Sequence, residues 1–475
     1  MLKQSYIYKM FVCLSNWLNK IFSESFLVNI FIRDVDNEKR ETETLFVRLI
    51  NKLIEIFRKI FSKLKLDKAF DNSIFTKPII WLSITVFLTP FLPTMMCLAM
   101  LIFTGLSLTL KILITPDLKL KYFKTNAWIL VFILIIGMSA FTSISLEESV
   151  NIALLMGAFA FSYFIITNTI GNKKQFKFIL YLFVIAAAIS AVYGIHQYIF
   201  GDVYSQAWLD SNMFEDIKMR VYSTFENPNV YGEYLILAIP IAIALFWTEK
   251  GFWKKTFLLA IAGITMLAMI LTFSRGCWLG ILFALAVLAI IIDRRFIILG
   301  IVALMLMPFV LPETIINRFM SIGDMADSST SYRVYIWMGT LAMLKDYWFC
   351  GVGLGETSFN TIYPLYSYNN IEAPHSHNLY LQIVSQFGIV GLIVFLGVVY
   401  NFYKEATISM LRKKNILLAG IIAGMTGFFL ESMFDYTWYN YRVILIFWMV
   451  LALGSVASKL EENKDGKELE LWLRF

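Results

Sequence analysis

Charged residues are scarce in this chain: they make up 16% of its 475 residues, whereas 59% are hydrophobic. An ordinary soluble protein carries about 25% charged residues, so this composition excludes a single aqueous domain. Glycine and proline are also few, with 25 and 10 residues, and no low-complexity tract occurs. Collagen-like and disordered chains are therefore excluded, and the composition indicates a polytopic membrane protein.

Histidine and cysteine are rarer still, with three and four residues. The cysteines are widely spaced and form no CxxC pair, so neither a disulfide framework nor a zinc site is indicated. The net charge of +7 would favour nucleic acid only if the basic residues clustered on a soluble face, but here they lie between apolar runs. We expect a lipid bilayer, and not nucleic acid, as the surroundings of the chain.

Long uncharged stretches dominate the chain after Lys77. A membrane-spanning helix needs about 20 mainly apolar residues. Residues 78–110 are long enough for two short helices that turn at Pro90 and Pro93. The other charge-poor stretches raise the predicted number of spans to twelve and lie at residues 126–146, 149–171, 178–200, 232–248, 256–273, 277–292, 296–311, 378–402, 415–430 and 443–458.

Basic residues concentrate in every second connection between these stretches, for example at Lys173, Lys174 and Lys177. Short cytoplasmic connections carry such an excess of Lys and Arg, so both termini are predicted to be cytoplasmic. The alternate connections, which include the acidic segment 202–233, then face outward. The predicted fold is an all-α membrane protein of about twelve transmembrane helices, with one large extracytoplasmic loop, residues 312–377, between helices nine and ten.

Three parts of the chain are expected. Residues 1–77 form a cytoplasmic N-terminal extension, in which apolar residues such as Leu49, Leu53 and Phe57 recur at helical spacing and basic residues supply the opposite side. This pattern is typical of an amphipathic helix on the inner leaflet, and a partner-binding helix is the alternative. Residues 78–458 form the transmembrane domain, and residues 459–475 form a cytoplasmic tail.

Two of the three histidines, His375 and His377, lie at the end of the long loop. His377 is expected at the outer end of span ten, where Ser376 or Asn378 caps the helix and the imidazole accepts a proton from an attacking hydroxyl. The alternative is a histidine pair that only binds loop backbone. A metal site needs three or more ligands, and the remaining histidine, His196, is distant in sequence, so no metal is expected.

Three arginines are predicted to face outward: Arg220, Arg275 and Arg333. Such arginines either reach for lipid phosphates at a helix end or bind a diphosphate bidentately. Gly276 follows Arg275 in a short turn and is expected to let a phosphate approach the backbone. Together with a histidine, three outward arginines predict a cationic site suited to a lipid diphosphate.

Other features of the external connections have weaker interpretations. A helix is predicted around 331–346, and Gly351, Gly353 and Gly355 are expected to form a tight turn rather than a dinucleotide site. Glu431 and Asp435 are interpreted as solvated loop charges, with acceptor binding as the alternative. Aromatic residues of the loop suit either the membrane interface or stacking on sugar rings; they are Trp337, Trp348, Tyr363, Tyr366 and Tyr368, with Tyr380 just beyond the loop.

Several of these motifs coincide in a known order. The chain resembles the O-antigen ligase family of bacterial membrane glycosyltransferases, which includes lipopolysaccharide O-antigen ligases, polysaccharide polymerases and protein O-oligosaccharyltransferases. The likeness covers about residues 190–400 and is carried by Phe225-Glu226-Asn227-Pro228-Asn229, Phe273-Ser274-Arg275-Gly276-Cys277-Trp278, Tyr332-Arg333, Gly351-Val352-Gly353-Leu354-Gly355 and His375-Ser376-His377-Asn378-Leu379-Tyr380.

The resemblance implies a GT-C-like fold and a metal-independent, inverting transfer without a cofactor. The donor is a glycan on undecaprenyl diphosphate, and the acceptor is a lipid, glycan or protein at the outer face of the bacterial cytoplasmic membrane. His377 is implied as catalytic base, Arg275 and Arg333, with Arg220, as diphosphate-binding groups, and His375 and Asn378 as support. A polymerase of the same family is the alternative, and a transporter or an envelope scaffold are competing classes. The N-terminal extension is outside the likeness.

Overall fold

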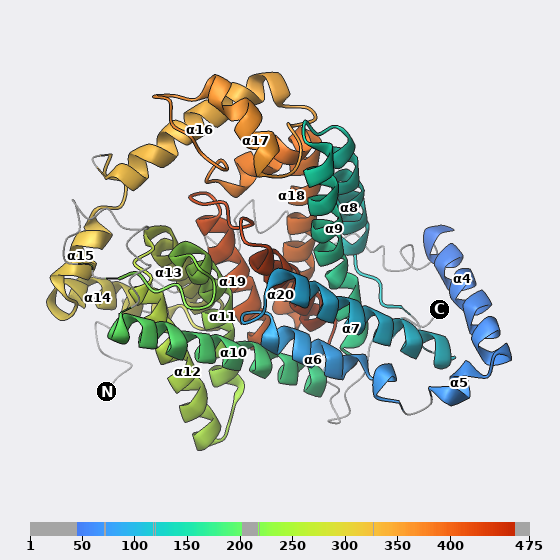
Figure 1. The fold of residues 1–475 in the computed structure, drawn as a ribbon. Coiled ribbons are helices and arrows are strands. Elements are labelled where there is room, and N and C mark those ends of the chain that lie inside the picture. The colour runs from blue at the N-terminus through green and yellow to red at the C-terminus, as the bar shows by residue number, and fades with distance from the viewer. Residues whose placement is uncertain are drawn as a thin grey trace.

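The computed structural model describes residues 45–70, 73–116, 118, 120–201, 217, 219–325 and 327–460. Throughout these residues the regular structure is helical, as predicted (Figure 1). Residues 1–44 of the N-terminal extension, residues 202–216 and 218 of the acidic connection 202–233, and the tail after Leu460 lie outside the described residues.

Eight of the described helices are long and apolar enough to cross a membrane. They are α7 (Thr94–Ile114), α9 (Leu146–Thr169), α10 (Lys173–Phe200), α11 (Pro228–Thr248), α12 (Phe252–Leu271), α13 (Arg275–Ile292), α18 (Leu379–Lys413) and α20 (Tyr441–Lys459). Four shorter apolar helices are α6 (Pro78–Leu88), α8 (Thr125–Phe141), α14 (Arg295–Val310) and α19 (Ile416–Glu431). A polytopic membrane protein is confirmed, whereas the number of twelve spans stays a prediction.

Helices α11 and α20 form the centre of the molecule, and α19 packs against α11 and α13. Small residues permit this close approach, since a Cβ at Gly427 would lie 2.4 Å from the carbonyl oxygen of Gly280 and one at Gly420 would lie 2.7 Å from that of Pro240. Apolar helices in lipid depend on such packing to associate. The end of α19, and the 432–440 connection that follows it, are thereby fixed against α13.

Aromatic rings fix the position of the 432–440 connection. Trp438 is 1% exposed and packs against the rings of Phe132, Phe395, Phe447 and Trp448, at centroid distances between 5.3 and 6.2 Å. Burying aromatic rings of this size stabilises a site strongly. The residues just before Trp438 are therefore held in a defined position.

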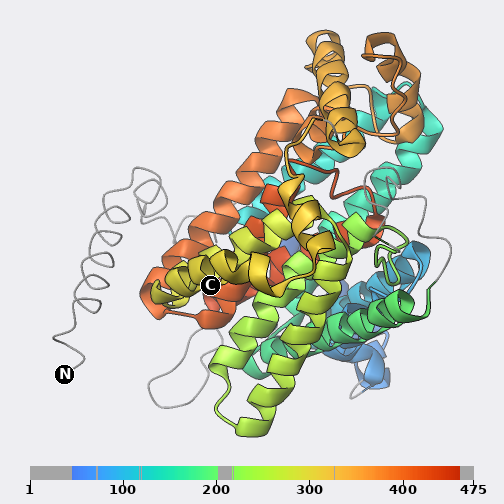
Figure 2. The same ribbon diagram turned by 90° about the vertical axis from the view of Figure 1, so that its left-hand side faces the viewer.

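The segment 312–377 is itself mostly helical. It contains α15 (Glu313–Met320), α16 (Ser328–Tyr347), α17 (Glu356–Ile362) and the short 3-10 helix η4 (Tyr363–Tyr366), so the helix predicted around 331–346 is confirmed. Helices α16 and α17 lie together at one end of the molecule, beside the turn between α8 and α9 (Figures 1 and 2). Glu148, on α9, accepts hydrogen bonds from the backbone N–H of Glu356 and Thr357, each at 3.2 Å.

The predicted glycine turn leads into α17. Gly351, Gly353 and Gly355 have φ angles of +72°, +102° and +101°. A Cβ at Gly353 would lie 2.1 Å from Ser143 Oγ, so only glycine fits where the turn meets the α8–α9 connection. The predicted glycine turn is therefore confirmed, and it packs against the α8–α9 connection.

The described part of the N-terminal extension contains α4 (Leu45–Lys63), α5 (Leu66–Ala69) and the 3-10 helix η2 (Ile74–Thr76). Arg58 connects α4 to the end of α7 by donating hydrogen bonds to the carbonyl oxygens of Ile112 and Leu118, at 3.0 and 2.7 Å. Several apolar side chains of this region are between 45% and 62% exposed, namely Leu49, Leu53, Ile56, Phe57, Ile60 and Leu64.

Candidate active site

His377 lies directly before α18, in a backbone conformation that is rare for a residue other than glycine. Its φ is +47°, and the next residue, Asn378, caps the helix by accepting a hydrogen bond from the N–H of Leu381 at 3.0 Å. The indole N–H of Trp337 donates to the carbonyl oxygen of His377 at 3.1 Å. The cap and the indole together fix the imidazole, so that its position results from tertiary contacts rather than a flexible loop.

The partner of His377 is Asp435, in the connection between α19 and α20. The imidazole Nδ1 lies 2.9 Å from Asp435 Oδ1. The second carboxylate oxygen accepts from Arg333 at 3.2 Å and from the Asn229 side chain at 2.9 Å. Burial raises the pKa of Asp435, but the charges of His377 and Arg333 outweigh it and hold the pKa well below the ordinary value.

An ionised Asp435 can only accept a hydrogen bond, so the proton of the neutral imidazole lies on Nδ1. This hydrogen bond assigns the tautomer of His377. The other ring nitrogen, Nε2, then carries the free lone pair. A carboxylate that orients an imidazole in this way makes it a general base and stabilises the imidazolium that forms. The His377 and Asp435 pair therefore has the geometry of a proton acceptor for a hydroxyl.

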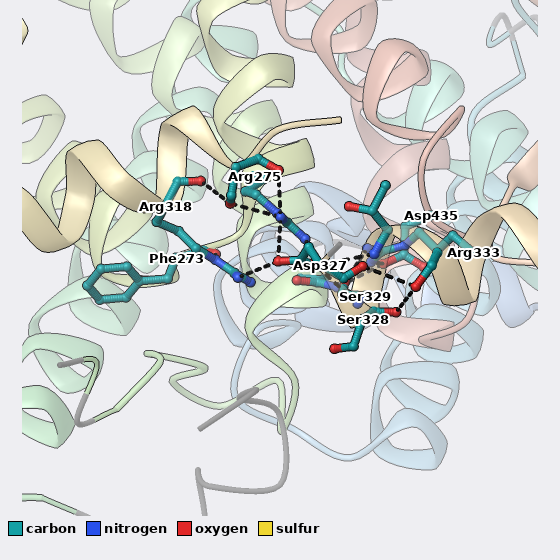
Figure 3. A network of polar contacts seen from close by, with 12 residues as sticks. Phe273, Arg275, Arg318, Asp327, Ser328, Ser329, Arg333 and Asp435 are labelled. Carbon is teal, nitrogen blue, oxygen red and sulfur yellow. Dashed lines mark hydrogen bonds and ion pairs between the residues drawn. The ribbon is translucent and has the colours of Figure 1, made fainter. Parts of the chain in front are cut away.

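Next to this pair, Asp327 joins two further arginines (Figure 3). Arg275 donates two parallel hydrogen bonds to the carboxylate of Asp327, at 2.7 and 2.8 Å, and Arg318 lies 3.4 Å from the same group. Burial raises the pKa of Asp327, but the Arg275 contacts lower it below the ordinary value. Arg275 is 9% exposed, so it does not reach toward lipid.

Asp327 also begins the helix that carries Arg333. As the N-cap of α16, it accepts from the backbone N–H of Ser329 and Thr330 at 3.0 and 3.2 Å. The Ser329 hydroxyl in turn accepts from Arg333 at 2.8 Å. One carboxylate thus positions Arg275 directly and Arg333 through the first turn of α16.

Arg220 completes the group. It donates to Asn229 Oδ1 at 2.7 Å and to the Thr272 carbonyl oxygen at 2.9 Å, and so connects to Asp435 through Asn229. Burial, and then the charges of Arg318 and Arg333, lower the pKa of Arg220 to about 9. The structure therefore brings all three predicted arginines and His377 into one hydrogen-bonded network.

Three guanidinium groups contact two carboxylates in this network: Arg275 and Arg318 contact Asp327, and Arg333 contacts Asp435. Arg220 reaches Asp435 through Asn229, and Arg333 Nε is buried without a hydrogen-bond partner among the described residues. A buried cluster of arginines with an unused donor favours an anionic ligand. Phosphate oxygens match the planar fork of arginine.

His375 supports His377 from the other side. Its Nδ1 accepts the backbone N–H of His377 at 3.2 Å, and the two ring centroids are 4.2 Å apart. Burial, and then the charge of His377, lower the pKa of His375 to about 3. His375 is therefore neutral at physiological pH.

Two groups of side chains in the described part have ligand atoms within 4.8 Å of one another: His375, His377 and Asp435, and Glu233, Glu431 and Asp435. Both groups depend on Asp435, whose oxygens already accept from His377, Arg333 and Asn229. A metal ion bound there would have to displace these donors and lie beside a guanidinium.

Two expectations from the sequence are wrong. Gly276 does not open a path for a phosphate, because a Cβ there would lie 2.2 Å from Glu431 Oε2; its role is to let α13 pack against Glu431. Glu431 is not a solvated loop charge either, since it is 2% exposed at the end of α19. Asp435, 6% exposed, is likewise buried.

The sequence interpretation missed Asp327 and Arg318. Asp327 precedes Ser328, Ser329 and Thr330 just before the predicted helix, and this cap pattern could have identified it. Arg318 has no local signal. Among the aromatic residues that the sequence singled out, Tyr363 is buried and Tyr366 donates a hydrogen bond to Asp346, whereas Trp348 and Tyr368 are 54% and 43% exposed.

Residues 256–396 match the protein family described as O-antigen ligase. The matched region contains Arg275, Arg333 and His377, and it confirms the resemblance for the motifs from Phe273 onward; the motif Phe225–Asn229 lies outside the match. No curated protein matches the chain.

Proposed function

Because the chain carries this O-antigen ligase region, we propose that it transfers a glycan from undecaprenyl diphosphate to an acceptor hydroxyl, in the assembly of a cell-surface polysaccharide. The reaction takes place at the outer face of the bacterial cytoplasmic membrane. The observation that carries this proposal is that a histidine–aspartate pair and four arginines belong to one network of polar contacts.

The arginines hold the leaving group. Arg275, Arg333 and Arg220 bind the diphosphate of the donor, with Arg318 beside them. As the bond from the anomeric carbon to the diphosphate oxygen breaks, its electron pair stays on the diphosphate. Prearranged guanidinium groups stabilise that developing charge, and this supplies what a divalent ion supplies in many sugar transferases. The proposed reaction is therefore metal-independent and needs no cofactor.

His377 activates the acceptor. Its Nε2 takes the proton of the acceptor hydroxyl while the oxygen forms a bond to the anomeric carbon, and Asp435 stabilises the imidazolium. Attack from the face opposite the leaving diphosphate inverts the anomeric carbon. His375 and Asn378 act as positioning residues, because the first contacts the His377 backbone and the second fixes the start of α18.

The membrane orientation follows from charge. We place the basic connections, such as Lys173 to Lys177, in the cytoplasm, and the network with segment 312–377 outside. In this arrangement residues 78–458 form the transferase domain, twelve spans cross the membrane, and residues 459–475 are a cytoplasmic tail. The exposed apolar residues of α4 would lie on the inner leaflet, and a partner-binding role is the alternative.

A polymerase differs from a ligase only in its acceptor, which is a growing lipid-linked glycan instead of a lipid core or protein. The family covers both, so both remain within the proposal. A transporter fits less well. Its charged residues would follow a path through the bilayer, whereas the buried carboxylates Glu233 and Glu431 adjoin Asp435 at the same site.

Reconstituted protein with a synthetic undecaprenyl-diphosphate glycan tests the proposal. We expect release of undecaprenyl diphosphate and a new inverted glycosidic bond to one of three acceptors: a lipid A core, a lipid-linked glycan or a peptide. Mass spectrometry identifies which acceptor is used. Activity should survive EDTA; strict dependence on an added divalent ion, or no transfer to any of the three, would contradict the proposal.

A further inference from the structure

A cavity of about 310 Å³ is lined by His375 and by residues other than the arginines of the network. It is bordered by α7, α9, the start of α17 and the connection between α19 and α20. Tyr436 and Tyr439 line it, and their ring centroids lie 5.4 and 4.8 Å from that of His375. The cavity is thus separated from the His377 imidazole by one side chain, and its volume is at the lower end of the roughly 300–1,000 Å³ of small-molecule sites.

Its lining combines aromatic faces with hydrogen-bonding groups. Tyr439, 48% exposed, and Tyr441 contribute rings, while Gln382 and Asn440 contribute amides. Trp438 also lines the cavity, and its indole nitrogen is buried without a hydrogen-bond partner among the described residues. Aromatic rings beside several donors and acceptors are the surroundings that a sugar ring requires, because one of its faces is apolar and its rim carries hydroxyls.

The charges around the cavity have one sign. Glu148 and Glu356 line it, and none of the described residues that line it is Lys or Arg. His375, the only histidine among them, is neutral because burial lowers its pKa to about 3. Burial, together with the negative charge of Glu356, raises the pKa of the Tyr439 phenol. An anionic ligand would therefore meet two carboxylates and no Lys or Arg among the residues that line the cavity.

We infer that this cavity binds the acceptor sugar and that Glu148 and Glu356 restrict the acceptor to neutral or amino sugars. The inference rests on the proposed function, in which the acceptor hydroxyl must reach His377. The donor and acceptor then occupy sites of opposite charge: the diphosphate lies among the arginines, and the sugar that accepts the glycan lies between the two glutamates. A uronic acid or phosphorylated sugar is excluded from the acceptor position by repulsion.

Binding of three glycosides with the same ring and the same anomeric group tests this inference without any donor. The probes are methyl β-glucoside, methyl β-glucosaminide and methyl β-glucuronide, titrated onto the wild-type protein in nanodiscs and followed by saturation-transfer NMR. We expect the glucoside and glucosaminide to bind and the glucuronide to bind at least tenfold more weakly, about 1.4 kcal/mol. Equal binding of the glucuronide, or no binding of any probe, would overturn the inference.

Two variants locate the effect in the cavity. Glu356→Gln should reduce the difference in affinity between the glucuronide and the glucoside, since it removes one of the two negative charges. Tyr439→Ala should weaken the binding of all three glycosides. Tyr368→Ala, which removes an exposed tyrosine of segment 312–377 that does not line the cavity, should leave the binding of all three unchanged. If Tyr439→Ala and Tyr368→Ala behave alike, the cavity is not the sugar site.

The binding experiment and the transfer assay test the cavity assignment and the proposed function independently. Discrimination among the glycosides without any transfer from the lipid-linked donor would leave the cavity assignment in place and remove the proposed reaction. Transfer that proceeds normally in a protein that does not discriminate among the glycosides would remove the cavity assignment alone.

Discussion

Replacing Asp435 with asparagine removes the charge that orients His377 while keeping the shape of the side chain. Asp435 accepts hydrogen bonds from His377 at 2.9 Å, Asn229 at 2.9 Å and Arg333 at 3.2 Å, and it is 6% exposed. An amide at this position presents either an N–H to Nδ1, which favours the wrong tautomer, or a neutral oxygen. Neither stabilises an imidazolium as a carboxylate does.

The expected loss of activity in Asp435→Asn follows from the burial of the His377–Asp435 pair. Breaking a buried, hydrogen-bonded charge pair costs about 3–5 kcal/mol. If this loss falls on the transition state, in which His377 becomes cationic, kcat drops by about 10²–10⁴ at 1.36 kcal/mol for each tenfold. We expect the donor KM to change less than kcat, because Arg275 keeps its contacts with Asp327, although Arg333 loses its ion pair with Asp435.

The assay is release of undecaprenyl diphosphate by reconstituted protein at saturating donor and acceptor. Asp346→Asn is the matched control, since Asp346 is an aspartate of segment 312–377 that accepts a hydrogen bond from Tyr366. A kcat for Asp435→Asn within threefold of wild type, or a loss no larger than that of Asp346→Asn, would refute the role of the pair.

Three further predictions concern the arginines, the glycine contact and the buried histidine. Arg275→Lys loses the paired contact with Asp327 and should raise the donor KM at least tenfold; an unchanged KM would contradict diphosphate binding there. Gly276→Ala should destabilise the fold by about 1–3 kcal/mol through overlap with Glu431, whereas Gly263→Ala, with open space, should not, and equal melting temperatures would contradict the contact. His375 has a folded pKa of about 3, below its unfolded value of about 6.5, so stability should fall as pH drops below 6.5, by about 2 kcal/mol at pH 5. His375→Asn should reduce that decline between pH 7.5 and 5.0 in thermal unfolding, and an identical decline would contradict a buried neutral ring.

The helices were predictable because lipid leaves an isolated apolar segment no other way to satisfy its backbone. The cap at Asn378 and the helix around 331–346 were predictable for a related reason, since both depend on neighbours in sequence.

Other parts of the site depend on distant contacts, which local patterns do not encode. The pairing of Arg275 with Asp327 joins residues 52 positions apart, and that of His377 with Asp435 joins residues 58 apart. Gly276 was misinterpreted for the same reason, because the atom that fills its space belongs to Glu431 on another helix.

The most direct test of the central claim is a single-turnover measurement with His377→Ala, in which donor binding and glycan transfer are followed in the same sample. The account predicts that the variant binds the undecaprenyl-diphosphate glycan with near wild-type affinity, because the arginines are intact, and forms at least a hundredfold less product, in keeping with the loss of a general base. Transfer at the wild-type rate would show that the imidazole near Asp435 is not the base, and loss of donor binding would show that His377 holds the donor instead.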